Sequence, residues 1–240
     1  MDSLILDESI DDNIMEEIRL GQKLPIVERF ITISGEAPTM GQPMYLVRFS
    51  GCNLSCRYCD TPYRNEINET LTPAQLCDEI DRVMVSYPGI IILFTGGEPL
   101  LEPRSTILTD IAMKMHDVQF YAETNGSVPI DETAPDNLHY VLDWKTPSAG
   151  GGETFCIDNI RRMRTDHDVI KFVTDESDLP YIKDKIELIR CENELVRVYL
   201  SPQTGRIELT KLADFIISNK LNAAISVQLH KIIWGEKRGV

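Results

Sequence analysis

The chain has 240 residues, and its hydrophobic share of 42% and charged share of 26% are typical of a globular protein with a full hydrophobic core. Its 24 basic and 38 acidic side chains give a net charge of −14, which disfavours a nucleic-acid-binding protein because phosphate backbones would be repelled. The longest apolar run, residues 89–94, is far shorter than the roughly 20 residues that cross a bilayer, so we expect no contact with a membrane.

The N-terminal segment is rich in acidic residues and weakly amphipathic. We predict that residues 1–25 form an acidic extension ahead of a single main domain, residues 26–240. Charge-rich segments of this kind are usually solvated surface helices, so no function is expected of it. The first residues lack the basic flank of a signal peptide, which favours a cytoplasmic protein.

Strands and helices alternate along the rest of the chain. Short apolar runs bounded by turn residues predict strands over 44–49, 90–94, 119–123, 140–144, 169–173, 196–200 and 223–229. Helical periodicity is found near 103–115, 156–164, 178–190 and 208–219. A further helix begins at residues 72–75, where Thr72 is the N-cap, Pro73 takes the first position and Gln75 closes a capping box. This alternation predicts an α/β domain with a mostly parallel sheet, or a partial (β/α) barrel.

In such folds the functional side chains lie on the loops that follow the carboxyl ends of the strands. The loop after residues 44–49 contains Cys52, Cys56 and Cys59. The loop after residues 90–94 reads Thr-Gly-Gly-Glu-Pro, and later strands are followed by residues 123–127 and 145–148. Each of these loops is polar or rich in glycine, as a ligand-binding site requires.

Three of the six cysteines lie within eight residues, with the spacing C-x3-C-x2-C. Without an export signal, clustered thiols indicate metal or redox chemistry rather than a disulfide framework. The scattered Cys77, Cys156 and Cys191 are expected to be small buried thiols, and Cys77 lies inside a predicted helix.

Three thiolates leave two kinds of site open. A structural zinc site needs a fourth ligand, which this loop does not supply. A [4Fe–4S] cluster held by three cysteines leaves one iron free to bind a small chelating molecule, such as S-adenosylmethionine. The spacing of the cysteines does not by itself decide between these sites.

The glycine-rich loop favours the iron–sulfur interpretation. Gly96 and Gly97 allow a ligand to approach the backbone closely, and Glu98 offers an acceptor for a ligand ammonium group. Together with the cysteine loop one βα unit earlier, this segment resembles the radical S-adenosylmethionine superfamily. In that superfamily the three cysteines hold the cluster and the glycine-rich strand end binds the methionyl amino group.

Several further segments make the chain similar to one family in that superfamily, the 7-carboxy-7-deazaguanine synthases. The resemblance covers residues 33–240, and its most specific parts are Gly35-Glu36, Cys59-Asp60-Thr61 and the C-terminal residues 228–240. It implies conversion of 6-carboxy-5,6,7,8-tetrahydropterin to 7-carboxy-7-deazaguanine, with ring contraction and loss of ammonia, in 7-deazapurine (queuosine-type) biosynthesis. It also implies a [4Fe–4S] cluster, S-adenosylmethionine and Mg²⁺ as cofactors, a flavodoxin-like external electron donor, and a homodimer.

The resemblance assigns roles to single residues. Cys52, Cys56 and Cys59 would hold the cluster, and Thr61 would bind magnesium. S-adenosylmethionine would contact Tyr58, Asp60, Gly97, Glu98, Glu123, Asp143, Lys145, Ser201 and Gln203. The pterin would contact Ser34, Gly35, Glu36, Arg48, Thr95, His230 and Val240.

Chemistry supports two of these assignments in particular. The Glu36 carboxylate can accept two donors from the amidine edge of a pterin, and Arg48 can bind a carboxylate bidentately. Arg48 stands in an apolar predicted strand, where an unpaired charge would be costly, so a core salt bridge with an acidic neighbour is its alternative role. Ser34 and Ala37 depart from the family, whose members often have Gln and Gly at these positions.

Three other functions remain as alternatives at this stage. A glycyl-radical activating enzyme shares the cysteine spacing but acts on a partner protein and has no need of Glu36 or His230. A noncatalytic iron–sulfur or zinc module would bind metal without S-adenosylmethionine. A tRNA-modifying radical enzyme is disfavoured by the net charge of −14.

Overall fold

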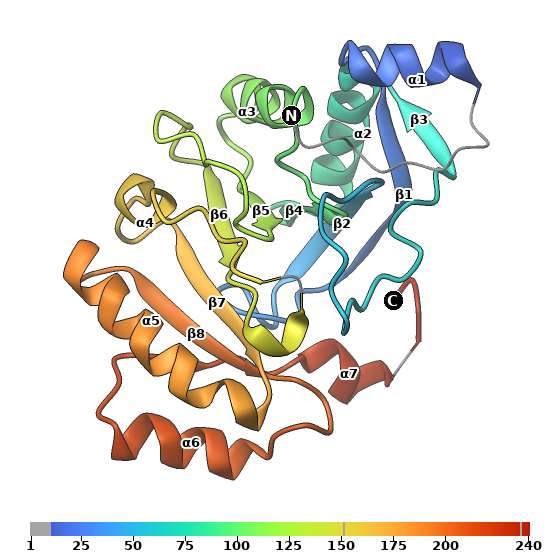
Figure 1. Ribbon diagram of the computed structural model, residues 1–240. Coiled ribbons are helices and arrows are strands. Elements are labelled where there is room, and N and C mark those ends of the chain that lie inside the picture. The colour runs from blue at the N-terminus through green and yellow to red at the C-terminus, as the bar shows by residue number, and fades with distance from the viewer. Residues whose placement is uncertain (1–10, 151, 236) are drawn as a thin grey trace.

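A nine-stranded sheet is the centre of the computed structural model, which describes residues 11–150, 152–235 and 237–240 (Figure 1). The strand order is β3-β1-β2-β4-β5-β6-β7-β8-β9, and neighbouring strands from β2 to β9 are parallel. β1 is antiparallel to both of its neighbours, β2 and β3. The strands are β1 (Leu24–Ile33), β2 (Pro43–Phe49), β3 (Glu69–Leu71), β4 (Ile91–Gly96), β5 (Phe120–Thr124), β6 (Leu138–Asp143), β7 (Val169–Thr174), β8 (Arg197–Pro202) and β9 (Ala224–Ile225).

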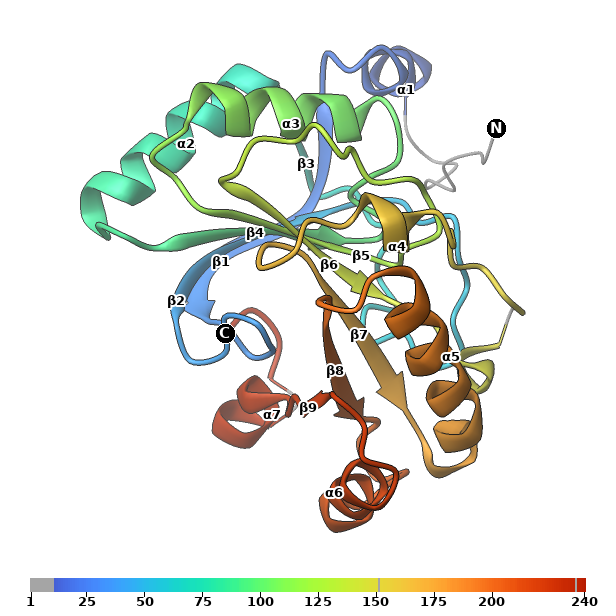
Figure 2. The ribbon, with the colours of Figure 1, turned by 90° about the vertical axis from the view of Figure 1, so that its left-hand side faces the viewer.

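Helices cover the convex face of this curved sheet, with α2 and α3 over one half and α5 along β7 and β8 (Figure 2). The helices are α1 (Asp12–Arg19), α2 (Pro73–Ser86), α3 (Arg104–Lys114), α4 (Asn159–Arg162), α5 (Leu179–Glu192), α6 (Leu209–Ser218) and α7 (Leu229–Trp234). Two short 3₁₀ helices are η1 (Pro147–Ala149) and η2 (Glu176–Asp178). The predicted mostly parallel α/β domain of the partial-barrel type is confirmed. In the described residues, no helix is both long and apolar enough to cross a membrane.

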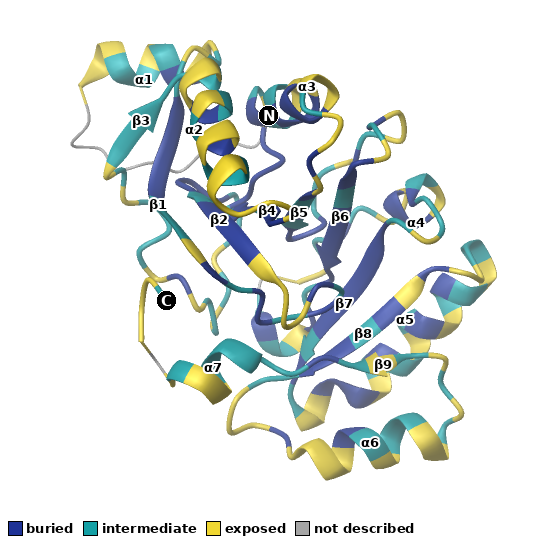
Figure 3. Cartoon of the chain, turned by 180° about the vertical axis from the view of Figure 1, so that it is seen from behind, coloured by how far each residue is buried: buried dark blue, intermediate teal, exposed yellow. Residues whose placement is uncertain are grey.

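The main hydrophobic core lies between the convex face of the sheet and the helices. Phe94 is at its centre, with its ring 5.8 Å from that of Phe49 and 5.3 Å from that of Phe120. Figure 3 shows that the central strands are buried along most of their length, which is why their sequences are continuous apolar runs. A smaller apolar cluster of Met44, Leu46 and Ile91 faces the concave side. The concave side is therefore left for a site at the carboxyl ends of the strands.

One predicted strand near the C-terminus differs from the structure. A strand was predicted over 223–229, but the structure has a strand only at Ala224–Ile225. The prediction is therefore wrong for the second half of this segment. There the backbone leaves the sheet: the amide of Leu229 donates to the carbonyl of Gly35, and helix α7 begins. The predicted extension contains α1, whose Ile18 is buried, while residues 1–10 lie outside the described part.

The expectation of a buried thiol is wrong for Cys191, which is exposed on α5. Buried Ile182, Ile186 and Ile189 define the inner face of that helix, and a residue two positions after Ile189 points the opposite way. Cys77 and Cys156 are half-buried.

The N-terminus of α2 has the predicted capping box. The Thr72 hydroxyl accepts from the Gln75 amide at 3.2 Å, and the Thr72 amide donates to the Gln75 side chain at 2.8 Å. We expect Thr72→Ala to lower the free energy of unfolding by about 1 kcal/mol, because it removes one of these two bonds. Urea denaturation followed by circular dichroism checks this value, with Ser86→Ala at the other end of α2 as the control. Equal unfolding midpoints for the wild type and Thr72→Ala would contradict the role of the cap.

Candidate active site

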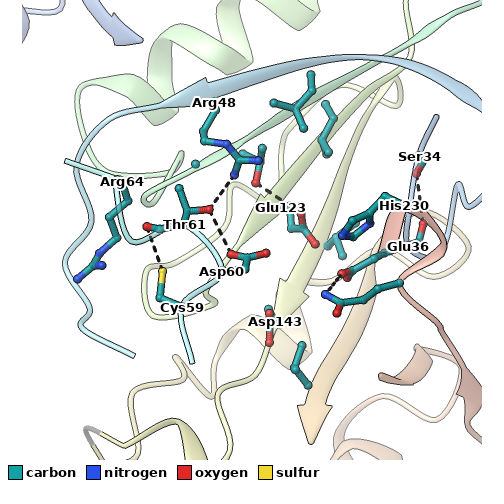
Figure 4. Close-up of a pocket in the computed structure, with 18 of the residues that line it drawn as sticks. Ser34, Glu36, Arg48, Cys59, Asp60, Thr61, Arg64, Glu123, Asp143 and His230 are labelled. Atoms are coloured by element: carbon teal, nitrogen blue, oxygen red, sulfur yellow. Dashed lines mark hydrogen bonds between the residues drawn. The ribbon is translucent and has the colours of Figure 1, made fainter. Parts of the chain in front are cut away.

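A cavity of about 630 Å³ opens on the concave side, at the carboxyl ends of the parallel strands. Most of the site residues predicted from the sequence line it: Ser34, Gly35, Glu36, Arg48, Cys52, Cys56, Tyr58, Cys59, Asp60, Thr61, Thr95, Gly97, Glu123, Asp143, Lys145, Gln203, His230 and Val240. Glu98 and Ser201 are buried but do not line the cavity. Figure 4 shows Arg48, Thr61 and Asp60 on one side of this space, Glu36 and His230 on the other, and Glu123 between them.

The cysteine loop supplies sulfur donors to the wall of the cavity. Cys52 is buried, Cys56 and Cys59 are half-buried, and all three are free thiols. Burial raises the pKa of Cys52 and of Cys56, so these groups are neutral thiols until a bound metal deprotonates them. The backbone amide of Leu54 lies 3.4 Å from the Cys52 sulfur and donates to it. In the described ranges no three His, Cys, Asp or Glu side chains converge on the position of a single metal ion.

The glycine-rich end of β4 packs directly on the start of the cysteine loop. The Gly97 amide donates to the carbonyl of Phe49 at 3.0 Å, and the Glu98 amide donates to the carbonyl of Gly51 at 2.9 Å. A Cβ atom on Gly97 would overlap the carbonyl group of Gly51 and lie 2.9 Å from the Cys52 nitrogen. A side chain at position 97 is therefore incompatible with the observed contact between the two loops.

Glu98 points away from the cavity and connects two strand ends. Its carboxylate accepts from the amides of Leu100 and Asn125 at 2.9 and 2.7 Å, and from the Thr124 hydroxyl at 2.7 Å. Burial raises the pKa of Glu98, although these donors oppose the shift. Buried Arg104 donates to the carbonyls of Glu98 and Ser50, and burial lowers its pKa to about 10. Glu98 thus holds the ends of β4 and β5 together.

A buried lysine that the sequence analysis did not single out lies at the centre of the charged residues. The Lys171 ammonium group on β7 donates to Glu36 at 2.5 Å and also to Glu123, and it lies 3.9 Å from Asp143. Burial alone would raise the pKa of Glu36, but the Lys171 charge outweighs it and holds the pKa at about 2. Glu36 is therefore ionised, and the stability from this pair is complete above about pH 4.5 and lost as the pH falls toward about 2.

Asp143 links this group of charges to the loop after β6. Its carboxylate accepts from the Lys145 ammonium at 2.8 Å. Burial opposes the charge on Lys145, but Asp143 prevails and raises the pKa of this lysine above its usual value. The other carboxylate oxygen of Asp143 and the hydroxyl of Ser201 are buried without a hydrogen-bond partner in the described part of the chain. Unsatisfied buried acceptors are costly, so the Asp143 oxygen, which lies on a residue that lines the cavity, fits a ligand that donates a hydrogen bond.

On the opposite wall, Arg48 makes the salt bridge that was its alternative role and also faces the cavity. Its guanidinium bonds Glu28 across the β1–β2 pair at 2.7 Å and donates to the Thr61 hydroxyl at 3.1 Å. Arg238, from the C-terminal segment, bonds the other Glu28 oxygen at 3.0 Å and stacks over Tyr63 at 3.4 Å. Burial would raise the pKa of Glu28, but the two guanidinium groups lower it. Glu28 and Arg238 were missed because they are 210 residues apart in sequence.

Gly35 and His230 meet where the two distant ends of the sheet approach each other. A Cβ atom on Gly35 would overlap the His230 ring, so only glycine allows this contact. The Gln228 side chain donates to Glu36 at 2.9 Å. The segment before β2 and the start of α7 thus form one wall of the cavity, and this wall holds Glu36 between Gln228 and Lys171.

Sequence comparison identifies the family. Residues 46–146 match the model of the Radical SAM superfamily. The chain is 35% identical over 227 residues to the 7-carboxy-7-deazaguanine synthase of Clostridium acetobutylicum, covering 90% of this chain and 98% of that protein. It is 32% identical over 225 residues to the enzyme of the same name from Chlorobaculum tepidum, covering 90% and 97% of the two chains.

A solved structure supports the fold. The crystal structure of QueE from Escherichia coli superposes with a TM-score of 0.68 over 92% of this chain and 99% of that chain, at 22% sequence identity. The two sequence relatives each cover 90% of this chain. This chain is therefore a radical S-adenosylmethionine enzyme that belongs to the 7-carboxy-7-deazaguanine synthase family.

Proposed function

We propose that the protein converts 6-carboxy-5,6,7,8-tetrahydropterin into 7-carboxy-7-deazaguanine, with contraction of the ring and loss of ammonia, for the biosynthesis of 7-deazapurines such as queuosine. The observation that carries this proposal is that the three cysteines, Glu36 and Arg48 line the same cavity. A pterin has a donor-rich amidine edge at one end and this substrate has a carboxylate at the other. The anionic Glu36 and the cationic Arg48, on opposite sides of the cavity, match these two ends.

As a radical S-adenosylmethionine enzyme, the protein uses a [4Fe–4S] cluster and S-adenosylmethionine, and the residues present fit both. Cys52, Cys56 and Cys59 would hold the cluster. When bound, the two groups together supply the 5′-deoxyadenosyl radical that starts the reaction. The unpartnered Asp143 oxygen and the nearby Lys145 offer an acceptor and a donor for the polar groups of S-adenosylmethionine.

The other predicted contacts of S-adenosylmethionine are part of the same proposal. Tyr58 extends from the cysteine loop, and its hydroxyl donates to the carbonyl of Val173 at 3.0 Å. This bond fixes the position of the ring at the cavity wall. Glu98 and Ser201 do not line the cavity, so we propose that Glu98 supports the strand ends rather than contacting the cofactor directly.

Magnesium is proposed to bind at Thr61. The Thr61 hydroxyl lies between the Arg48 guanidinium and the Asp60 carboxylate, to which it donates at 3.2 Å. Oxygen atoms are the ligands that this hard cation prefers. A substrate carboxylate bound by Arg48 would lie beside this hydroxyl and could share the cation with it.

Several broader features of the protein are proposed by resemblance to the family. We propose that residues 26–240 are the catalytic domain, that the protein is a cytoplasmic homodimer, and that a flavodoxin-like protein supplies the electron. We also propose a small-molecule substrate rather than a partner protein, and the presence of the cavity supports this.

The function is tested by an anaerobic assay of the iron-reconstituted protein with 6-carboxytetrahydropterin, S-adenosylmethionine, magnesium and a reductant, analysed by mass spectrometry. We expect 7-carboxy-7-deazaguanine and ammonia. Formation of 5′-deoxyadenosine without this product would show that the substrate is wrong and would favour the glycyl-radical activating enzyme. Absence of both compounds, in a folded protein with a full cluster, would contradict the catalytic role.

Glu36→Gln is expected to weaken pterin binding about 10-fold to 100-fold, because hydrogen bonds to a charged acceptor are worth about 1.5–3 kcal/mol. Reductive cleavage of S-adenosylmethionine in the absence of pterin should be unchanged, since Glu36 lies on the proposed substrate side. Titration calorimetry of the reconstituted protein measures the first effect and 5′-deoxyadenosine formation the second. Exposed Glu132→Gln is the matched control. An unchanged pterin affinity would remove Glu36 from the site.

A further inference from the structure

Lys171 lies at the boundary between the proposed pterin side and the proposed S-adenosylmethionine side of the cavity. Its side chain is only 4% exposed, and it projects from β7 in register with Asp143 on β6. Its ammonium group donates to one oxygen of Glu36, which belongs to the loop after β1, and to one oxygen of Glu123, on β5. One buried cation thus connects the two carboxylates that the proposed function assigns to different ligands.

The second oxygen of each carboxylate is held by a neutral donor. Gln228 donates to Glu36 at 2.9 Å, and Thr95 donates to Glu123 at 3.4 Å. A carboxylate has about four acceptor positions, so each group keeps capacity for a donor from a ligand. The two carboxylates are therefore oriented from both sides and still able to bind.

The charges around Lys171 show what this residue contributes. Glu36, Glu123 and Asp143 surround it, and Lys145 is the other cation, 2.8 Å from Asp143. Without Lys171, three carboxylates would share one ammonium group that is already bonded to Asp143. Removing one partner of a buried pair leaves an uncompensated charge, which is strongly unfavourable. Glu36 and Glu123 would then either move apart or take up protons.

We propose that Lys171 is a positioning residue for the reaction, which keeps Glu36 ionised and aimed at the pterin and ties it to Glu123 on the side of S-adenosylmethionine. This inference rests on the proposed function and assigns Lys171 no contact with the reacting atoms. It explains why a charged residue is kept in a strand whose other residues are almost entirely apolar.

A pH dependence follows from this arrangement. The titratable groups that face Glu36 and Lys171 are Glu123 on β5, Asp143 on β6, Lys145 in the following loop, and His230 on α7. With Lys171 present, Glu36 stays ionised throughout the neutral range. With an uncharged residue there, burial and the two neighbouring carboxylates raise the pKa of Glu36, so it takes up a proton as the pH falls.

The test is the substitution Lys171→Met, which keeps the length and removes the charge, with Lys183→Met on α5 as the matched control. Binding of 6-carboxytetrahydropterin is measured by titration calorimetry of the reconstituted protein with S-adenosylmethionine present. We expect K171M to weaken binding about 10-fold or more at about pH 8, and by a larger factor at about pH 6. K183M should bind like the wild type.

A double-mutant cycle separates positioning from a general structural effect. If Lys171 acts through Glu36, K171M should cost much less affinity in the Glu36→Gln background than in the wild type. Additive losses in the two single variants would overturn the proposal, and so would equal pterin affinity of K171M and the wild type. If K171M does not fold, K171R keeps the charge, and it must retain the wild-type pH profile of pterin binding or the proposal fails.

These outcomes are distinct from failure of the proposed function. Failure of the wild type to bind this pterin would overturn the substrate assignment, and with it this inference. Normal binding by the wild type and by K171M would overturn only the role of Lys171.

Discussion

Replacing Cys56 by alanine is expected to abolish assembly of the iron–sulfur cluster and all product formation. In the proposed site three thiolates would hold the cluster, and two would not hold it firmly. Cys56 lies between Cys52 and Cys59 on one loop, and the nearest alternative in the sequence, Cys77, is fixed within helix α2. Iron and sulfide analysis after anaerobic reconstitution measures the effect, with about four irons per chain expected for the wild type.

Cys191→Ala is the matched control for this substitution. Cys191 is exposed on α5, outside the residues that line the cavity, and its removal should leave the iron content at the wild-type value. Cys56→Ala should also lose the visible absorption of the cluster while keeping the far-ultraviolet circular dichroism of the folded protein. Full iron content in Cys56→Ala would show that the loop does not hold the cluster in the proposed way.

The order of strands and helices could be predicted from local patterns, except at the edge of the sheet. The central strands are buried on both faces, and their continuous apolar runs are clear in the sequence. β1 was missed because its register shifts between Ile26 and Glu28, which breaks the two-residue alternation of a half-buried strand. Its adjacent charges, Glu28 and Arg29, also suggest a surface segment, yet each has a partner elsewhere in the fold.

Glu98 shows how far the site itself could be predicted. The rule that strand ends carry function located the loops correctly, since most of the residues chosen line one cavity. The sequence cannot give the direction in which a side chain points, however, and Glu98 turns inward to bind Thr124 and Asn125. The position of a residue in a motif therefore predicts that the residue lies near the cavity, but it is a poorer guide to whether the side chain contacts a ligand.

Lys171 was not predicted to be a site residue, although its sequence context is the same as that of Arg48. Both are single cations in apolar strands, where a charge must have partners. The partners of Lys171 come from segments up to 135 residues away, so no local pattern identifies them. A charged residue in an otherwise buried strand is thus a useful signal even where no motif surrounds it.

Gly97→Ala is expected both to weaken the binding of S-adenosylmethionine and to lower the free energy of unfolding. The added Cβ would overlap the Gly51 carbonyl, and backbone cannot move aside as a flexible side chain can. The end of β4 and the start of the cysteine loop must then separate, which strains the bonds from Gly97 to Phe49 and from Glu98 to Gly51. Overpacking of this kind costs about 1–3 kcal/mol. We expect a lower unfolding midpoint in urea and an affinity for S-adenosylmethionine that is about tenfold lower.

The control for Gly97→Ala must separate this overlap from the general cost of replacing glycine. Gly97 is not among the glycines with positive φ, so alanine is acceptable to its own backbone conformation. Gly89 has a φ of +82° and no atom near its missing Cβ, so Gly89→Ala strains the backbone without any overlap. Gly89→Ala should therefore lose stability but keep its affinity for S-adenosylmethionine, whereas Gly97→Ala should lose both. If Gly97→Ala lost only stability, the contact between the two loops would hold the fold together without shaping the cofactor site.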